Sequence, residues 1–123
     1  MPAAEVNVYE ALTGFAGLQA LVSTRIYPSV MPQDVDKPAV VYFRVVGNRE
    51  VLLADGGGSG VERVLFQFTS WAKSMSESYA VAEQVRLALA AASFETVVQV
   101  NRSGYEPDTR LFSFTYDIAI WHR

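Results

Sequence analysis

The side chains that could do chemistry are few in this sequence. It has a single histidine, His122, and no cysteine, which excludes thiol catalysis and metal sites built from cysteine. The carboxylates of Glu50, Asp55, Glu62 and Asp117 could meet in a sheet and act as a general acid and base. Exposed strands and loop tips carry such residues by default, and this structural interpretation is the favoured one. The sequence therefore predicts no catalytic residue, no metal site and no cofactor.

A glycine-rich segment invites comparison with phosphate-binding loops. It reads Asp55, Gly56, Gly57, Gly58, Ser59, Gly60. The Lys-Ser or Lys-Thr pair and the helix that complete a phosphate-binding loop do not follow it. Fixing a glycine-rich tract in one conformation costs much conformational entropy. We therefore interpret this segment as the tip of a long hairpin that stays mobile until something binds it.

The elements that would position these residues centre on residues 61–89, where a strand turns directly into a helix. Val64, Phe66 and Phe68 alternate along the strand and predict one buried face. Ser74 and Glu77 have the spacing of a capping box, which predicts the first turn of a helix. The predicted buried stripe of this helix comprises Met75, Tyr79, Ala82, Val85 and Leu89, and its predicted solvent side comprises Lys73, Glu77, Glu83, Gln84 and Arg86.

The remaining chain predicts two more groups of elements. A helix over residues 3–22 should break near Gly14, and a short extended segment should follow at residues 25–27, before a proline-rich loop at 28–38. Further strands are expected at residues 39–46, 96–102 and 111–121, with a turn at 103–109. This order predicts a single α+β domain over residues 1–123, a mainly antiparallel four-stranded sheet of two hairpins with both helices on its apolar face.

Charge and hydropathy exclude two classes of partner. The net charge of −3 and a pI near 5.0 disfavour tight binding to nucleic acid, which needs clustered Lys and Arg. No apolar run approaches the roughly 20 residues of a spanning helix, and the amino terminus lacks the basic and apolar regions of a signal peptide. We therefore expect no membrane association.

Large apolar residues on the predicted second face of the sheet need a cover. Leu65, Trp71 and Trp121 fall opposite the face that the helices occupy. Either they form an exposed patch of the kind that marks a protein partner, or the loop at 28–38 folds over them. The sequence leaves both interpretations open.

Several segments, taken in order, resemble a known family. They are residues 21–28 (LVSTRIYP), 38–42 (PAVVY), 66–72 (FQFTSWA), 82–89 (AEQVRLAL) and 116–121 (YDIAIW), with Asp108 before the last of them. Their order over nearly the whole chain resembles the tail-completion family of long-tailed bacteriophages and prophages, which includes tail-to-head joining and tail-terminator proteins.

The resemblance implies a structural protein of the virion tail with no enzymatic activity, made in the bacterial host cytoplasm. It implies a homo-oligomeric ring, expected to be hexameric, that contacts the tail tube protein and the head connector or stopper protein. DNA would pass through the lumen of such a ring only as cargo, and a modestly acidic subunit suits that passage.

The interface hypotheses follow from the same resemblance and from the loops. We expect Arg25, Tyr27 and Pro28, the tip at Asp55, Gly56, Gly57, Gly58, Ser59 and Gly60, and the tryptophans Trp71 and Trp121 to contact partners. Arg25 and Tyr27 could equally be structural, tying a short strand to the sheet edge.

Two other functions remain as alternatives. A small α+β fold can bind a small molecule or act as a cyclase-like enzyme on the concave face of its sheet, and a deep apolar pocket with converging polar groups would favour that function. The chain could also be another virion component, such as a head connector or baseplate adaptor.

Overall fold

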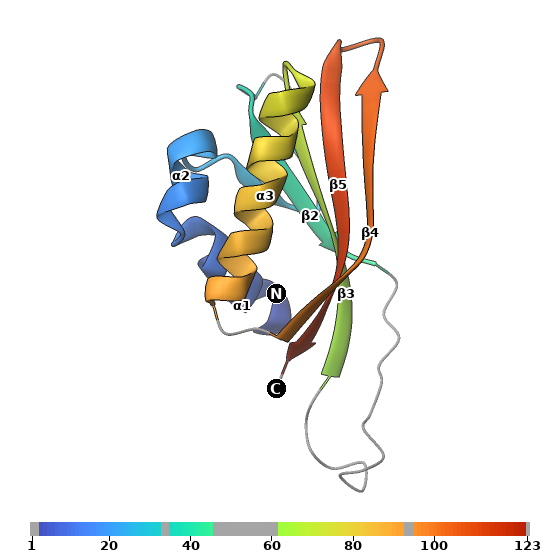
Figure 1. Ribbon diagram of the computed structural model, residues 1–123. Helices are drawn as coiled ribbons and strands as arrows, with labels where there is room; N and C mark the ends of the chain where they lie inside the picture. Colours follow the sequence, from blue (N-terminus) through green and yellow to red (C-terminus); the bar gives the residue numbers. More distant parts are fainter. Residues whose placement is uncertain (1–2, 33–34, 46–61, 93–94, 123) are drawn as a thin grey trace, which may run out of the picture.

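The computed structural model describes residues 3–32, 35–45, 62–92 and 95–122 (Figure 1). The helices in these ranges are α1 (Ala3–Thr13), α2 (Ala16–Val22) and α3 (Met75–Ala91). The strands are β1 (Ile26–Pro28), β2 (Ala39–Arg44), β3 (Glu62–Ala72), β4 (Glu95–Glu106) and β5 (Leu111–His122). None of the described helices is long and apolar enough to cross a membrane.

The described strands form one mixed sheet in the order β1-β2-β3-β5-β4. The neighbours β2, β3, β5 and β4 are antiparallel, as predicted. The prediction of a four-stranded sheet was wrong in one respect, because β1 adds a strand that runs parallel to β2 with Ile26 opposite Val40. Three residues are too few to show the alternation by which a strand is recognised in a sequence.

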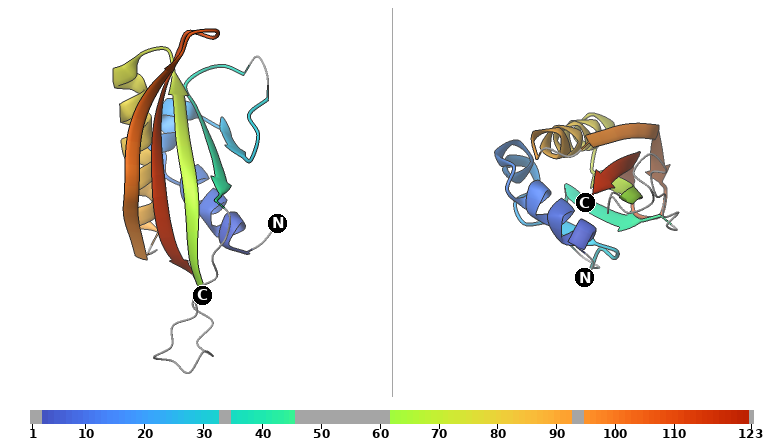
Figure 2. Two further views of the ribbon diagram at one scale, coloured as in Figure 1. Left: turned by 90° about the vertical axis from the view of Figure 1, so that its right-hand side faces the viewer. Right: turned by 90° about the horizontal axis from the view of Figure 1, so that it is seen from below.

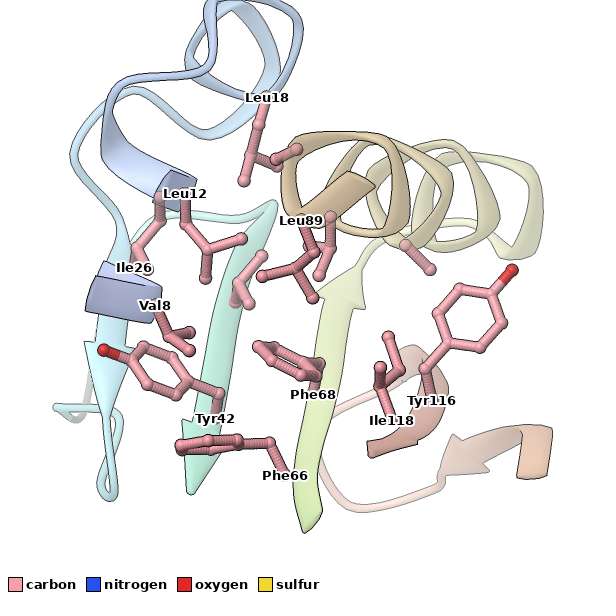
Figure 3. Packing of buried hydrophobic residues seen from close by; sticks show 14 of the residues in the cluster. Val8, Leu12, Leu18, Ile26, Tyr42, Phe66, Phe68, Leu89, Tyr116 and Ile118 are labelled. Carbon is pink, nitrogen blue, oxygen red and sulfur yellow. The ribbon is translucent and has the colours of Figure 1, made fainter. Parts of the chain in front are cut away.

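The core lies between the sheet and the helices, which all cover the same face (Figure 1). The view from below in Figure 2 shows the helices on one side of the sheet. Tyr42 of β2 stacks on Phe68 of β3 with ring centroids 5.7 Å apart, and Phe66 packs against both rings. Figure 3 shows these rings meeting side chains of α1 and α3, among them Val8 and Leu89. The predicted buried face of β3 is confirmed.

The start of α3 is confirmed, with one difference in its cap. Ser74 Oγ accepts a hydrogen bond from the Glu77 amide at 3.2 Å, as a capping residue does. Glu77 Oε1 accepts from the Lys73 amide at 3.4 Å, one residue before the amide that a capping box would use. The bond to Glu77 Oε1 is therefore longer than the bond to Ser74 Oγ, and it comes from a different amide than in a capping box.

The buried stripe of α3 is rotated from the prediction. Its buried residues are Ser78, Val81, Ala82, Val85, Ala88 and Leu89. Met75 and Tyr79 are exposed instead, which corrects their predicted place in the core. Each residue turns a helix by about 100°, so Tyr79 lies well to one side of its buried neighbour Ser78. The polar Ser78 is accommodated because its hydroxyl donates to the Met75 carbonyl at 2.8 Å.

The amino-terminal helical region is broken as predicted. α1 ends at Thr13 and α2 begins at Ala16, with Phe15 in an extended conformation between them. The hairpin of β4 and β5 differs from its prediction, because the turn was expected at 103–109 but β4 continues to Glu106. Tyr105 lies opposite Phe112 with ring centroids 4.8 Å apart, and this cross-strand pair extends the ladder past Gly104.

Candidate functional site

The sheet face turned away from the helices, here called the open face, is composed of successive cross-strand rows. One row aligns Val41, Thr69, Thr115 and Arg102, the next aligns Phe43, Gln67 and Asp117, and a third aligns Leu65, Ala119 and Val97. Figure 2 shows this face with the helices behind it. No described helix crosses this face.

A polar belt crosses the middle of the open face. Gln67 Nε2 donates to Asp117 Oδ1 at 3.2 Å, and Arg102 Nη1 pairs with Asp117 Oδ2 at 3.4 Å. The hydroxyl groups of Thr69 and Thr115 lie 3.1 Å apart. These bonds join β3, β5 and β4 through side chains. In the belt, the negative charge of Asp117 is balanced by the positive charge of Arg102.

Both tryptophans predicted at an interface lie on the open face, at opposite ends of it. Trp71 is opposite Ser113 of β5, and Trp121 is eight residues further along that strand. At 3.3 Å per residue, their backbone positions are about 26 Å apart. Both side chains are half-buried. The two tryptophans therefore flank the polar belt and do not form one cluster.

The open face also presents apolar side chains to solvent. Phe43 is 40% exposed and Val97 is 47% exposed, on β2 and β4 respectively. The described part of the segment between β1 and β2 lies beside the β2 edge in Figure 2, away from the middle of the face. Leu65, Trp71 and Trp121 are all half-buried, and the two interpretations that the sequence left open for them, contact with a partner and cover by this loop, both stay predictions.

A second apolar surface, here called the aromatic flank, lies on the helix side of the β4–β5 hairpin. It consists of Tyr79, Tyr105, Phe112 and Phe114. Tyr79 of α3 meets Phe114 edge-on at 5.2 Å, and the two tyrosines are 43% and 50% exposed. The hairpin extends beyond α3 (Figure 1).

A polar cluster joins α3 to β5 beneath the aromatic flank. The Tyr116 hydroxyl donates to Glu83 Oε1, and Arg86 Nη2 pairs with Glu83 Oε2 at 2.9 Å. Burial and the hydrogen bond to Glu83 raise the pKa of Tyr116 to about 12. The hydrogen bonds from Arg86 and from Tyr116 lower the pKa of Glu83. Glu83 was predicted to face water, and its side chain is 28% exposed while it also bonds to Tyr116 of β5, a contact that the sequence did not indicate.

The three predicted interface residues near β1 lie at the far edge of the sheet. Arg25 Nε donates to the Pro38 carbonyl at 2.9 Å, and the Arg25 carbonyl accepts from the Val40 amide at 3.0 Å. These bonds fasten the start of β1 to β2, which is the structural alternative that the sequence left open for Arg25. Tyr27 and Pro28 are half-buried in this edge strand. The predicted tip at 55–60 lies outside the described residues.

The described residues offer little for metal or substrate chemistry. Their His, Asp and Glu side chains include no group of three that could hold a metal ion. Three hollows that they line are open to solvent, and none of these three brings a general acid and a general base together at an enclosed cavity.

Comparison with known proteins gives a consistent result. The family model described as "Tail completion protein gp17" matches residues 6–123. A solved structure titled "Virion of native gene transfer agent (GTA) particle" contains a chain similar to this one at 18% identity and a TM-score of 0.56. The similarity covers 93% of this chain and 90% of that chain, and at this identity it concerns the fold. No curated protein matches the sequence.

Proposed function

Because the chain belongs to the tail completion protein gp17 family, we propose that it acts as a ring subunit that completes the tail tube and joins it to the head connector. The protein is a structural component of the bacteriophage virion tail. The ring, its expected six subunits, and its contacts with a tail tube protein and a head connector or stopper protein are the proposed parts. Catalysis has no place in this function.

The proposed ring is supported by one observation, the presence of two dissimilar surfaces on one subunit. The open face presents Phe43 and Val97 around a polar belt, and the aromatic flank presents Tyr79 and Tyr105 on the opposite side of the same hairpin. A closed ring with more than two subunits uses a head-to-tail contact, which requires two different surfaces on each subunit. Exposed aromatic side chains are also enriched at protein interfaces.

Charge supports the passage of DNA through the proposed ring. The chain carries a net charge of −3, so a ring of these subunits repels a polyanion in its lumen. The polar belt on the open face, with Asp117 and Arg102 paired, adds no net positive charge. DNA would therefore be cargo and not a ligand.

A complementation experiment tests the proposal. A phage or prophage lacking this gene is supplied with the protein carrying Phe43→Asp or Tyr105→Asp, and joined particles are counted by electron microscopy. Both side chains are already partly exposed, so folding should survive, while a charge placed in either surface should oppose burial against a neighbour. We expect separate heads and tails to accumulate with both variants.

The matched control is Val30→Asp, which places the same charge at a side chain 76% exposed and outside both surfaces. It should give the number of joined particles that the unmodified protein gives. Light scattering over a range of concentrations then measures the oligomeric state of each variant. Normal joining by both interface variants would refute the proposed surfaces, and particles that join without the protein would refute the function.

A further inference from the structure

Four segments meet around an open hollow of about 620 Å³ at the end of the sheet where α3 begins and β4 turns into β5 (Figure 1). Its lining includes Arg25 before β1, Lys37 before β2 and Lys73 between β3 and α3. We call it the cationic hollow. Lys37 and Lys73 are the only lysines in the sequence, so every lysine of this acidic protein lines one hollow.

Hydrogen bonds hold two of the three cations of the cationic hollow in place, and no described carboxylate neutralises any of the three. Arg25 Nε donates to the Pro38 carbonyl at 2.9 Å, and Lys37 Nζ donates to the Val35 carbonyl at 2.6 Å. Both acceptors are uncharged. Among the described residues, none of the three cations forms an ion pair with a carboxylate. Holding a charged group before binding lowers the entropy lost when a ligand arrives.

The rest of the lining is compatible with an anionic ligand that also has an apolar part. Asp36 is the one acidic residue of the lining, against three cations. Val35 and Leu111 supply apolar wall, and Thr109 supplies a hydroxyl. Glu106 and Asp108 belong to the same hairpin end but do not line the hollow.

We propose that the cationic hollow binds the carboxylate of an acidic segment of a neighbouring protein in the tail. A carboxylate can accept charge-assisted hydrogen bonds from a guanidinium and from ammonium groups at once. The methylene groups of a Glu side chain would contact Val35 and Leu111. The proposal rests on the proposed function for the identity of the protein that supplies the acidic segment, because a subunit of the tail stays in contact with neighbouring proteins.

DNA is the less favoured ligand for this hollow. Binding to a DNA backbone uses cations spread along a stripe that follows successive phosphates. Here the cations surround one concavity, and the protein that carries them has a net charge of −3. Both features favour a single anionic group over a polymer of phosphates.

The test uses the isolated full-length chain, so that it is independent of ring assembly. A hexaglutamate peptide is titrated into isotopically labelled protein, and NMR shifts are followed at the Arg25 side chain, at both lysines and at the Thr109 amide. We expect saturable shifts at these groups, weaker binding at high salt, and no such shifts with a hexaglutamine peptide. Shifts spread over the whole surface, or none at saturation of the peptide, would overturn the proposal.

Charge-neutral variants provide the matched comparison. Lys73→Gln changes an exposed side chain, and the double variant Lys37→Gln with Lys73→Gln removes both lysines. The double variant should bind hexaglutamate about fivefold more weakly, as the loss of two partly exposed ion pairs implies. Arg102→Gln, on the open face, removes one positive charge as Lys73→Gln does, and it should bind as the unmodified chain does. Equal weakening by Arg102→Gln would show a general charge effect and refute the hollow.

A short DNA duplex is the competing probe. If the duplex shifts the same signals at lower concentration than hexaglutamate, the carboxylate ligand is refuted in favour of phosphate. If the peptide binds but the joining of heads to tails is unaffected by loss of the gene, the hollow stands and the proposed function fails. If joining requires the protein and the peptide does not bind, the function stands and the hollow fails.

Discussion

The Tyr116 hydroxyl of β5 donates a hydrogen bond to Glu83 Oε1 of α3, and Arg86 holds the other oxygen of the same carboxylate at 2.9 Å. Figure 3 shows the Tyr116 hydroxyl directed toward α3 at the margin of the core. This bond is a polar link between the central helix and the strand that carries the aromatic flank. The attachment of α3 to β5 therefore depends on the ionisation states of Tyr116 and Glu83.

The first prediction concerns alkaline pH. The pKa of Tyr116 is raised to about 12 in the folded protein, so between about pH 10 and 12 the unfolded chain loses this proton first. The folded state then binds more protons, and the free energy of unfolding must fall as pH rises through that interval. Tyr116→Phe should lose much of this fall, measured by denaturant titration at several pH values. Tyr105→Phe, at a half-exposed ring, is the control and should keep it.

The second prediction concerns acidic pH. The pKa of Glu83 is lowered, first by the hydrogen bond from Arg86, so its contribution to stability is present above its ordinary value of 4.5. The contribution should disappear as pH falls below that value through the lowered pKa. Glu83→Gln should therefore be less stable than the unmodified chain at neutral pH, and the difference should shrink in acid. A difference that stays constant on acidification would contradict the link.

The third prediction tests the helix stripe as the structure has it. Leu89→Asp places an unpaired charge at a fully buried position and should lower the free energy of unfolding by several kcal/mol, of the order of 3 to 5. Leu87→Asp, two residues earlier on the same helix and 39% exposed, should cost less than about 1 kcal/mol. Thermal melts of the two variants measure the contrast, and similar melting temperatures would show that the stripe is misassigned.

The fourth prediction concerns the cap of α3. Ser74→Ala removes the acceptor for the Glu77 amide and should cost about 1 kcal/mol, the usual value for loss of a helix cap. Ser76→Ala is the control, since this exposed serine lies inside the first turn and alanine has the higher helix propensity. Ser76→Ala should be neutral or slightly stabilising in the same denaturant titration. If Ser76→Ala lowered the free energy of unfolding as much as Ser74→Ala does, the capping role of Ser74 would be refuted.

What the sequence could predict depended on how local each signal was. The alternation over Val64, Phe66 and Phe68 and the cap at Ser74 arise from neighbours in the chain, and the structure confirms both. Contacts between distant segments were not accessible in this way. The pairing of Glu83 with Tyr116 joins residues 33 positions apart, so no signal near Glu83 in the sequence indicated it.

The candidate surfaces show the same division. Strand periodicity correctly placed Trp71 and Trp121 on the face opposite the helices, but it could not reveal that β5 separates them along its length. Tyr79 was assigned to the core because the phase of a helical stripe is uncertain by about one residue, or 100°. Lys37 of the cationic hollow precedes β2, and Lys73 follows β3. The two lysines are far apart in the sequence, and only the topology of the sheet brings them together.

The last prediction concerns a buried hydroxyl that joins three elements. Ser70 of β3 is almost fully buried, and its Oγ lies 2.6 Å from the Ser78 carbonyl of α3 and 3.2 Å from the Phe114 carbonyl of β5. Ser70→Ala removes this donor without adding volume and should lower the free energy of unfolding by about 1 kcal/mol. Ser103→Ala, at an exposed position of β4, changes the same atoms in water and should be close to neutral.

Hydrogen exchange distinguishes this bond from simple packing. Because the Ser70 hydroxyl bonds to the carbonyl of Ser78, its loss should speed exchange of amides in the first turns of α3 more than in β4. A uniform change across the sheet would indicate only a global loss of stability. Local acceleration would show that one hydroxyl fixes the amino-terminal half of α3 against the sheet, and with it the position of Tyr79 beside Phe114.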